Sequence, residues 1–241
     1  MEHPVALITG ANKGIGLETA RQLGSRGCII WLGARDPELG RMAAQTLASQ
    51  GTDVRFVQID VTSDASVRAA LSTVTELSGR LDILVNNAGI TAGGRVVPSA
   101  LEIDAIKTIY EVNVFGAIRV TQAFLPLLRQ STAGRIVMVS SRLGSLTLHT
   151  DPADPLVASN LLGYNSSKSA LNAVTVAFAK ELSGTSIKVN AADPGYTATD
   201  LNGHSGTQTV DIGATSTVEL ALLPDDGPTG GYFSKDGSVP W

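Results

Sequence analysis

Near its start the chain reads Val5-Ala-Leu-Ile-Thr9, and Gly10-Ala-Asn-Lys-Gly-Ile-Gly16 follows directly. The apolar run is typical of a short buried β-strand, and the glycines mark a tight turn that leads into a helix. Because glycine has no side chain, the backbone of such a turn can approach a pyrophosphate, which a helix N-terminus attracts. The spacing of the three glycines departs from the usual Rossmann pattern. The stretch predicts a phosphate-binding turn, with an ordinary glycine-rich turn as the alternative.

The same alternation of apolar runs and helical periodicity continues along the chain. Further strands are predicted at residues 28–32, 54–59, 81–85, 135–139 and 187–191, with a candidate seventh at 231–233. Helices are predicted between them at about 38–49, 67–77, 100–130 and 164–182, the last one stopping at the glycine at position 184. Strands separated by helices of this length indicate right-handed βαβ units. We therefore expect an α/β fold, a Rossmann-type doubly wound parallel sheet of about seven strands with helices on both faces.

No linker-like stretch divides the chain, so a single domain is predicted over residues 1–241. Two stretches, 146–162 and 196–217, interrupt the alternation and are predicted as irregular loops. Each follows the carboxyl end of a strand, where ligands bind in parallel sheets, so both are candidate substrate loops.

Composition excludes several classes of protein. The 241 residues carry a formal net charge of −4, which argues against a general nucleic-acid binder. The single cysteine, Cys28, excludes an internal disulfide, and the three histidines are too scattered for a metal site. No apolar run is long enough to span a membrane, and no signal peptide is visible. We expect a cytoplasmic protein without a metal, a nucleic-acid partner or a membrane segment.

Tyr164 and Lys168 form the pair that predicts chemistry. At positions i and i+4 of a predicted helix, both side chains project from one face. A lysine cation close to a phenol favours the phenolate and lowers the pKa of the tyrosine, which suits general acid–base catalysis. The alternative is a partly exposed tyrosine beside a solvated lysine.

Together the motifs resemble the short-chain dehydrogenase/reductase superfamily in its form of about 250 residues. The motifs follow in the family's order over essentially the whole chain: residues 9–16, Asp60-Val61, Asn86-Asn-Ala-Gly89, Asn113, Ser140-Ser141, Tyr164 to Lys168, and Pro194-Gly195 with Thr199. Several stretches, among them Asn12-Lys-Gly-Ile-Gly16 and Asp193-Pro-Gly-Tyr-Thr-Ala-Thr-Asp200, are similar to the carbonyl-reductase group.

The resemblance implies catalytic roles for Asn113, Ser141, Tyr164 and Lys168. Tyr164 would donate a proton to a carbonyl oxygen, Ser141 would hydrogen-bond that oxygen, and Asn113 would support a water chain to Lys168. Ser140 competes with Ser141, and the match of Ser140-Ser-Arg-Leu-Gly144 to the family's signature favours the second serine. The gap between Ser141 and Tyr164 is longer than the family commonly has, which places an insertion beside the active site at about 151–155.

The resemblance also implies a cofactor site. Its residues would be Gly10, Asn12, Lys13, Gly14, Ile15, Gly16, Arg35, Asp60, Val61, Asn87, Ala88, Gly89, Tyr164, Lys168, Pro194, Gly195, Thr197 and Thr199, with Thr197 where the family usually has valine. NAD-preferring relatives carry an acidic residue at the end of the second strand, where this chain has Ala34. Arg35 and Lys13 can hold a 2′-phosphate, and Asp36 is read as the start of the next helix. NADP(H) is therefore favoured over NAD(H), with solvated cations as the alternative.

These expectations describe an NADPH-dependent carbonyl reductase that converts a ketone or aldehyde into an alcohol. The two loops contain few charged residues, which favours an apolar or aromatic substrate. The alternatives are an NAD(P)-dependent dehydrogenase of a secondary alcohol or sugar, a reductase of another double bond, and a non-catalytic NADP(H)-binding sensor. The resemblance is compatible with a monomer or a homodimer.

Overall fold

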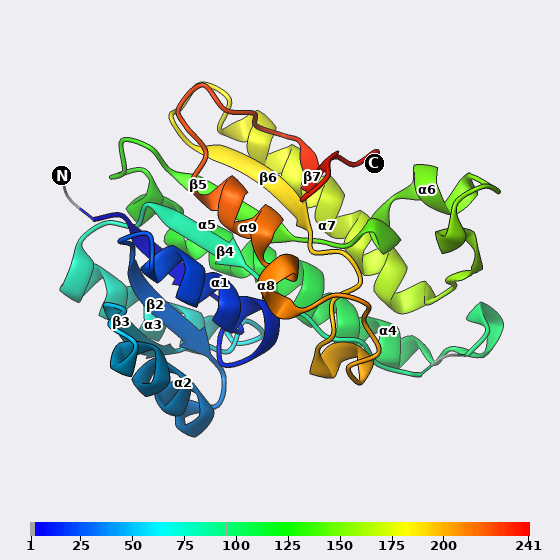
Figure 1. Ribbon diagram of the computed structural model, residues 1–241, viewed down its shortest axis with the longest axis horizontal. Coiled ribbons are helices and arrows are strands. Elements are labelled where there is room, and N and C mark those ends of the chain that lie inside the picture. The colour runs from blue at the N-terminus through cyan, green and yellow to red at the C-terminus, as the bar shows by residue number, and fades with distance from the viewer. Residues whose placement is uncertain (1–2, 95) are drawn as a thin grey trace.

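The structure is a computed structural model that describes residues 3–94 and 96–241, without the side chains of Leu156 and Val157. Residues 1, 2 and 95 of the predicted domain and those two side chains of the predicted 146–162 loop lie outside the described part. The described residues form one sheet of eight strands in the order β3-β2-β1-β4-β5-β6-β7-β8 (Figure 1). The strands are β1 (Val5–Ile8), β2 (Ile29–Ala34), β3 (Val54–Gln58), β4 (Ile83–Asn86), β5 (Arg135–Val139), β6 (Lys188–Asp193), β7 (Tyr232–Ser234) and β8 (Gly237–Ser238).

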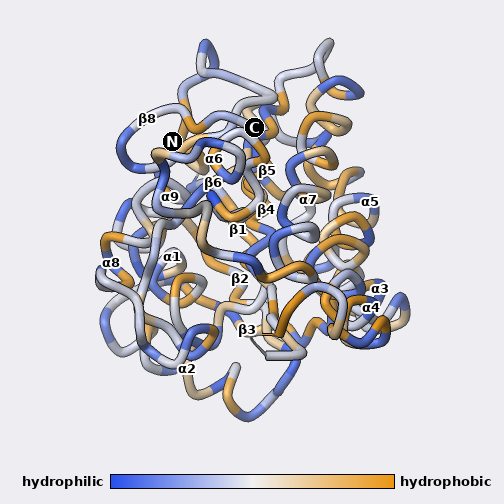
Figure 2. Tube along the Cα trace, turned by 90° about the vertical axis from the view of Figure 1, so that its right-hand side faces the viewer, coloured by the Kyte–Doolittle hydropathy of each residue, from blue (hydrophilic) through white to orange (hydrophobic). Residues whose placement is uncertain are grey.

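Helices cover both faces of the sheet (Figure 1). The helices are α1 (Gly14–Gly24), α2 (Pro37–Ser49), α3 (Asp64–Ser78), α4 (Ile103–Tyr110), α5 (Ala117–Leu128), α6 (Leu146–Thr150), α7 (Leu162–Glu181), α8 (Val210–Gly213) and α9 (Thr215–Ala221). Side chains of β1 alternate between two cores: Val5 and Leu7 pack with residues of α3, α5 and α7, whereas Ala6 and Ile8 pack with residues of α1, α2 and α9. Figure 2 shows these apolar strands at the centre of the molecule. Because both of their faces are buried, the inner strands are largely apolar, whereas the edge strand β3 exposes Arg55 and Gln58.

Seven strands run parallel, and this confirms the predicted doubly wound sheet. The eighth strand, β8, was not predicted; it pairs antiparallel with β7 through two residue pairs. A two-residue strand next to a turn has too little sequence to show a periodic pattern.

The structure differs from the predicted elements in four further places. The helix expected over 100–130 is divided into α4, a π-helical stretch at Glu111–Gly116, and α5. Helix α7 ends at Glu181 with Leu182 as its C-cap, so the glycine at position 184 does not terminate it as predicted. The 146–162 stretch is not wholly irregular, because it contains α6 and a 3-10 turn at Pro155–Ala158. The 196–217 stretch likewise contains a 3-10 turn at Asp200–Asn202, helix α8 and the start of α9.

Candidate active site

The glycine-rich turn joins β1 to α1 and has the backbone that its sequence predicted. Gly10 and Gly14 have φ of 62° and 58°, in the left-handed region that favours glycine. A Cβ on Gly16 would overlap Asn87 Nδ2 and lie 2.7 Å from the Gly10 carbonyl oxygen. Lys13 is the N-cap of α1, and no side chain of the described residues caps this helix. The first-turn N–H groups are therefore free of side-chain caps, as anion binding requires.

The segment after β4 holds this turn in place. Thr9 Oγ1 accepts hydrogen bonds from the backbone N–H groups of Asn87 and Ala88, both at 3.0 Å. Asn87 Nδ2 donates to the carbonyl oxygens of Thr9 at 2.8 Å and Gly10 at 3.1 Å. Asn87 and Ala88 thus lie beside the glycine turn. Their hydrogen bonds also give them a structural role that the motif alone did not reveal.

Tyr164 and Lys168 lie on α7 and face each other. Lys168 Nζ is 5.6 Å from the centre of the Tyr164 ring and donates to the Val139 carbonyl oxygen at 2.7 Å. A Cβ on Gly89 would lie 3.6 Å from Lys168 Nζ, so the segment after β4 meets α7 here. The i, i+4 spacing therefore placed both groups on one face as expected, next to the carboxyl end of β5.

Burial dominates the protonation of this pair. It raises the pKa of Tyr164 to about 12, although a hydrogen bond with Ser141 acts in the opposite direction. Burial also lowers the pKa of Lys168 to about 8. The direction for Tyr164 is opposite to the one expected from a neighbouring lysine, because the loss of water outweighs the other effects. At neutral pH Tyr164 is a neutral phenol, the form that donates a proton.

Asn113 is buried in the π-helical stretch between α4 and α5. Its Oδ1 accepts from the backbone N–H of Ile90 at 2.8 Å, and its Nδ2 donates to Ile90 O and to Ser167 Oγ, both at 3.0 Å. These bonds tie the β4 segment to α7 near Lys168. A π-helical turn inside an α-helix often marks a functional site.

The two serines after β5 have different surroundings. Ser140 is buried, and its hydroxyl donates to Asn172 Oδ1 at 2.5 Å. Ser141 accepts from the backbone N–H of Leu143 at 3.2 Å and is hydrogen-bonded with Tyr164. Only Ser141 of the two therefore lies against the Tyr164 hydroxyl, which favours the second serine.

The cations expected at the 2′-phosphate differ in their partners. Ala34 is buried at the end of β2, and Asp36 caps α2 by accepting from the N–H groups of Glu38 and Leu39. Arg35 is exposed, and within the described residues no carboxylate pairs with it. Lys13 instead contacts Asp200 Oδ2 at 2.6 Å, an exposed ion pair that joins the glycine turn to the 196–217 loop.

The remaining residues predicted to bind the cofactor follow the carboxyl ends of β1 and β3. Asn12 is in the glycine turn and Ile15 in the first turn of α1, both partly buried. Asp60 Oδ1 accepts from the N–H and hydroxyl of Thr62, at 3.0 and 2.7 Å, and Val61 is buried.

The segment after β6 lies against the glycine turn. Gly195 has φ of 70°, and a Cβ on Gly14 would lie 3.6 Å from Thr199 Cγ2. Thr197 is buried, and its hydroxyl donates to the Pro194 carbonyl oxygen at 2.9 Å. Its side chain therefore acts within the loop, which the family pattern did not show.

An ion pair with a buried carboxylate lies near these segments and was missed from the sequence. Asp193, at the end of β6, contacts Arg142 with 2.8 Å between Oδ2 and Nε, and the Asp193 side chain is only 1% exposed. The sequence does show an acidic residue, Asp193, just after a predicted buried strand and directly before Pro194-Gly195, and this could have marked it as a buried carboxylate. No local pattern identified its partner.

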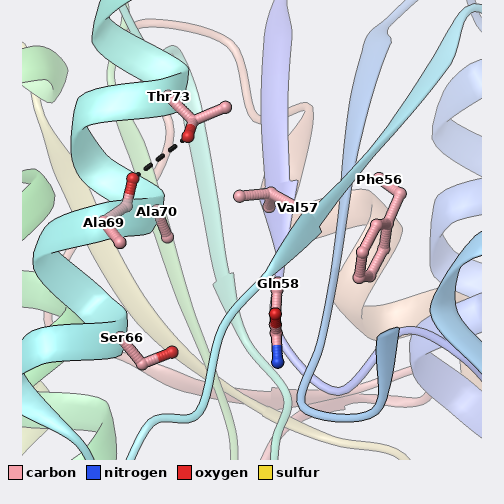
Figure 3. A pocket seen from close by; sticks show the side chains of 7 residues that line it. All are labelled: Phe56, Val57, Gln58, Ser66, Ala69, Ala70 and Thr73. Atoms are coloured by element: carbon pink, nitrogen blue, oxygen red, sulfur yellow. Dashed lines mark hydrogen bonds between the residues drawn. The ribbon is translucent and has the colours of Figure 1, made fainter. Parts of the chain in front are cut away.

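A separate surface hollow lies between β3 and α3. Its volume is about 410 Å³, and its lining residues are Phe56, Val57, Gln58, Ser66, Ala69, Ala70 and Thr73 (Figure 3). None of the predicted site residues lines it, so it is distinct from the candidate active site.

The comparisons with known proteins agree with this geometry. The sequence profile of the short chain dehydrogenase family matches residues 4–209. The chain belongs to this family. As a short-chain dehydrogenase it is an oxidoreductase that acts on carbonyl or alcohol groups, and the resemblance read from its motifs is confirmed.

Individual relatives are similar over nearly their whole length. The chain is 32% identical to (+)-neomenthol dehydrogenase of Capsicum annuum, over 95% of each chain. It is 32% identical to carbonyl reductase [NADPH] 1 of Mus musculus, over 99% of this chain and 98% of that protein. The crystal structure of NADPH-bound carbonyl reductase from chicken fatty liver superposes with a TM-score of 0.86 at 28% identity, covering both chains completely.

The described residues contain neither a candidate membrane span nor a candidate metal site. None of their helices is long and apolar enough to cross a membrane. No group of three or more His, Cys, Asp or Glu side chains in residues 3–94 and 96–241 is arranged to hold a metal ion.

Proposed function

We propose that this short-chain dehydrogenase is an NADPH-dependent carbonyl reductase that converts a ketone or aldehyde into an alcohol. The observation that carries the proposal is the convergence of Ser141, Tyr164 and Lys168 beside the glycine turn, with Tyr164 protonated at neutral pH because burial raises its pKa to about 12. The similarity to carbonyl reductase [NADPH] 1 of Mus musculus supports the same reaction class.

The residues fit NADP(H). The uncapped N-terminus of α1 and the glycine backbone would hold the pyrophosphate, and Lys168 would bind the nicotinamide ribose. Arg35 would hold the 2′-phosphate, because its guanidinium has no carboxylate partner among the described residues and Asp36 is committed to capping α2. Lys13 would contribute less there, since Asp200 already binds it. When bound, the cofactor supplies the hydride.

The protein's own contribution is proton transfer and orientation. Ser141 and Tyr164 would hydrogen-bond the substrate oxygen, and Tyr164 would donate its proton as the oxygen becomes an alkoxide. Lys168, with a pKa of about 8, would be largely protonated at neutral pH and would stabilise the resulting phenolate. Asn113 would hold the segments around Lys168 so that a proton can return to Tyr164 through water.

An apolar or aromatic carbonyl compound is the substrate class we propose. Leu146 and Leu162 from the 146–162 stretch and Tyr196 and Leu201 from the 196–217 stretch are exposed large apolar side chains. An apolar substrate would cover such side chains, which water solvates poorly. We also propose that the enzyme is cytoplasmic. We propose that it is a monomer or a homodimer, and light scattering after gel filtration would measure this oligomeric state.

The test is oxidation of NADPH, followed by the absorbance of the reduced nicotinamide, with a panel of ketones, aldehydes, quinones and imines. NADP⁺ with secondary alcohols and sugars, and NADH with each carbonyl, serve as parallel arms. Turnover of ketones or aldehydes with NADPH supports the proposal. NADPH binding without turnover of any panel member would favour the non-catalytic sensor, and turnover of sugars alone would favour the dehydrogenase.

A further inference from the structure

The carboxylate of Asp193 is one of the most buried charges near the proposed active site. Asp193 Oδ1 accepts from the backbone N–H groups of Arg142 at 3.0 Å and Gly195 at 3.1 Å, and Oδ2 accepts from Arg142 Nε at 2.8 Å. A buried carboxylate is costly unless it is paired and hydrogen-bonded, and here it has three donors. This charge is therefore stable only while Arg142 stays in place.

These bonds join two segments that both reach the active site. Arg142 directly follows Ser141 and begins the 3-10 turn Arg142–Gly144 after β5, whereas Gly195 belongs to the turn after β6. β5 and β6 are neighbours in the sheet, so both turns leave the same edge. The bond from the Arg142 N–H to Asp193 therefore holds the backbone directly after Ser141.

We propose that Asp193 is a positioning residue of this site, whose carboxylate, paired with Arg142, holds Ser141 against Tyr164 and sets the charge next to the Tyr164 hydroxyl. The proposal rests on the reductase function proposed above. It assigns Asp193 no contact with substrate.

The charge of Asp193 acts on Tyr164 in a defined direction. A nearby anion disfavours the phenolate, so Asp193 contributes to raising the pKa of Tyr164. Three other titratable or charged groups lie next to Tyr164 or Asp193. They are Lys168 on α7, Arg142 and the Tyr232 phenol on β7. Arg142 offsets this effect through its ion pair with Asp193, which partly neutralises the carboxylate.

Charged groups on the elements packed around α7 have partners elsewhere. On α4, Asp104 and Lys107 form an exposed ion pair, and Glu111 of the π-helical stretch pairs with Arg119. Asp154 of the 146–162 loop acts electrostatically on Arg142. Arg142 and Asp193 are therefore the pair whose removal changes the charge beside Tyr164 in opposite senses.

Four variants test the proposal: Asp193→Asn, Arg142→Ala, Arg142→Lys and the control Asp82→Asn. Asp82 is also a largely buried carboxylate that pairs with an arginine, but it lies at the amino end of β4, away from the site. For each variant, kcat and kcat/KM would be measured across pH for alcohol oxidation with NADP⁺ and for carbonyl reduction with NADPH. NADPH affinity by fluorescence and melting by circular dichroism would accompany these rates.

We expect opposite shifts. In Asp193→Asn the acid limb of the oxidation profile moves to lower pH by about one unit, and in Arg142→Ala it moves to higher pH by a similar amount. Arg142→Ala also lowers kcat for reduction about tenfold with little change in NADPH affinity, because the turn next to Ser141 keeps its backbone bond to Asp193 and loses the side-chain bond. Arg142→Lys restores part of the lost kcat. Asp82→Asn changes the melting temperature and leaves the acid limb of the oxidation profile at the wild-type pH.

Shifts in the same direction, or profiles that match the wild type, would overturn the proposal. If Asp193→Asn does not fold, Arg142→Ala decides alone: its side chain is 40% exposed and its backbone N–H still reaches Asp193. In Arg142→Ala, a shift of the acid limb of the oxidation profile to higher pH then supports the proposal. An acid limb at the wild-type pH, or at a lower one, refutes it. A wild-type enzyme that turns over no carbonyl or alcohol would contradict the reductase function instead.

Discussion

Replacing Gly16 by alanine should destabilise the protein through a clash that the structure defines. The new Cβ would overlap Asn87 Nδ2 and lie 2.7 Å from the Gly10 carbonyl oxygen. Asn87 must then give up its hydrogen bonds to Thr9 O and Gly10 O, at 2.8 and 3.1 Å. Because Gly10 O is a backbone atom, the turn itself must also move.

The expected loss of unfolding free energy is about 3 kcal/mol. Two hydrogen bonds contribute about 1 kcal/mol each, and overpacking costs about 2 kcal/mol. The gain in helix propensity from glycine to alanine returns about 1 kcal/mol. For a chain of this size, each kcal/mol lowers the melting temperature by about 2–4 °C. Gly16→Ala should therefore melt about 6–12 °C below the wild type.

Differential scanning calorimetry with and without NADPH would measure this effect. A matched control is Gly184→Ala, since a Cβ at Gly184 meets no atom within 4 Å. The control should melt within about 2 °C of the wild type. NADPH should raise the melting temperature of Gly16→Ala less than that of the wild type, because the displaced turn binds it more weakly. A Gly16→Ala protein that melts with the control would refute the inferred clash.

Four further predictions concern the chemistry of the site. Tyr164→Phe should bind NADPH normally and lose carbonyl reduction by about 10²-fold or more, and retained turnover would remove Tyr164 as the proton donor. Arg35→Ala should raise the KM for NADPH about tenfold or more with little effect on NADH, since a charged hydrogen bond contributes about 1.5–3 kcal/mol; equal effects would remove its role at the 2′-phosphate. Lys13→Ala should raise the same KM less than Arg35→Ala does, because Asp200 already pairs with Lys13; the reverse order would show that the pair opens when NADPH binds. Because burial lowers its pKa to about 8, Lys168 binds its proton less tightly in the folded state than in the unfolded state. Between about pH 8 and 10.5 the unfolding free energy of the wild type should therefore rise relative to that of Lys168→Met. Denaturant titrations that give a constant difference between the two proteins over this range would contradict the lowered pKa.

The local parts of the site followed from the sequence. Because residues four apart share a helix face, Tyr164 and Lys168 had to lie together once α7 formed. The left-handed φ of Gly10 and Gly14 likewise depends on residues that are neighbours in the chain. Strands buried on both faces are continuous apolar runs, so their number and order of appearance could be read directly, while the two-residue β8 could not.

Contacts between distant segments could not be read in this way. The sequence offered both Ser140 and Ser141, and only packing placed Asn172 against the first and Tyr164 against the second. Lys13 looked like a free cation until the 196–217 loop brought Asp200 to it. The division of the helix at Asn113 also escaped prediction, because six residues are too few for a periodic pattern to distinguish a π-helical turn from an α-helix.

The sequence by itself determined that the chain forms a doubly wound parallel sheet with a glycine-rich phosphate turn and a Tyr–Lys pair, because each depends on residues close in the chain. Only the tertiary structure decided the protonation of that pair and the partners of the charges around it. Burial of Tyr164 reverses the pKa direction that its neighbour Lys168 suggested. Asp193 and Arg142 meet only because β5 and β6 lie side by side, and the buried Asp193 carboxylate acts on Tyr164.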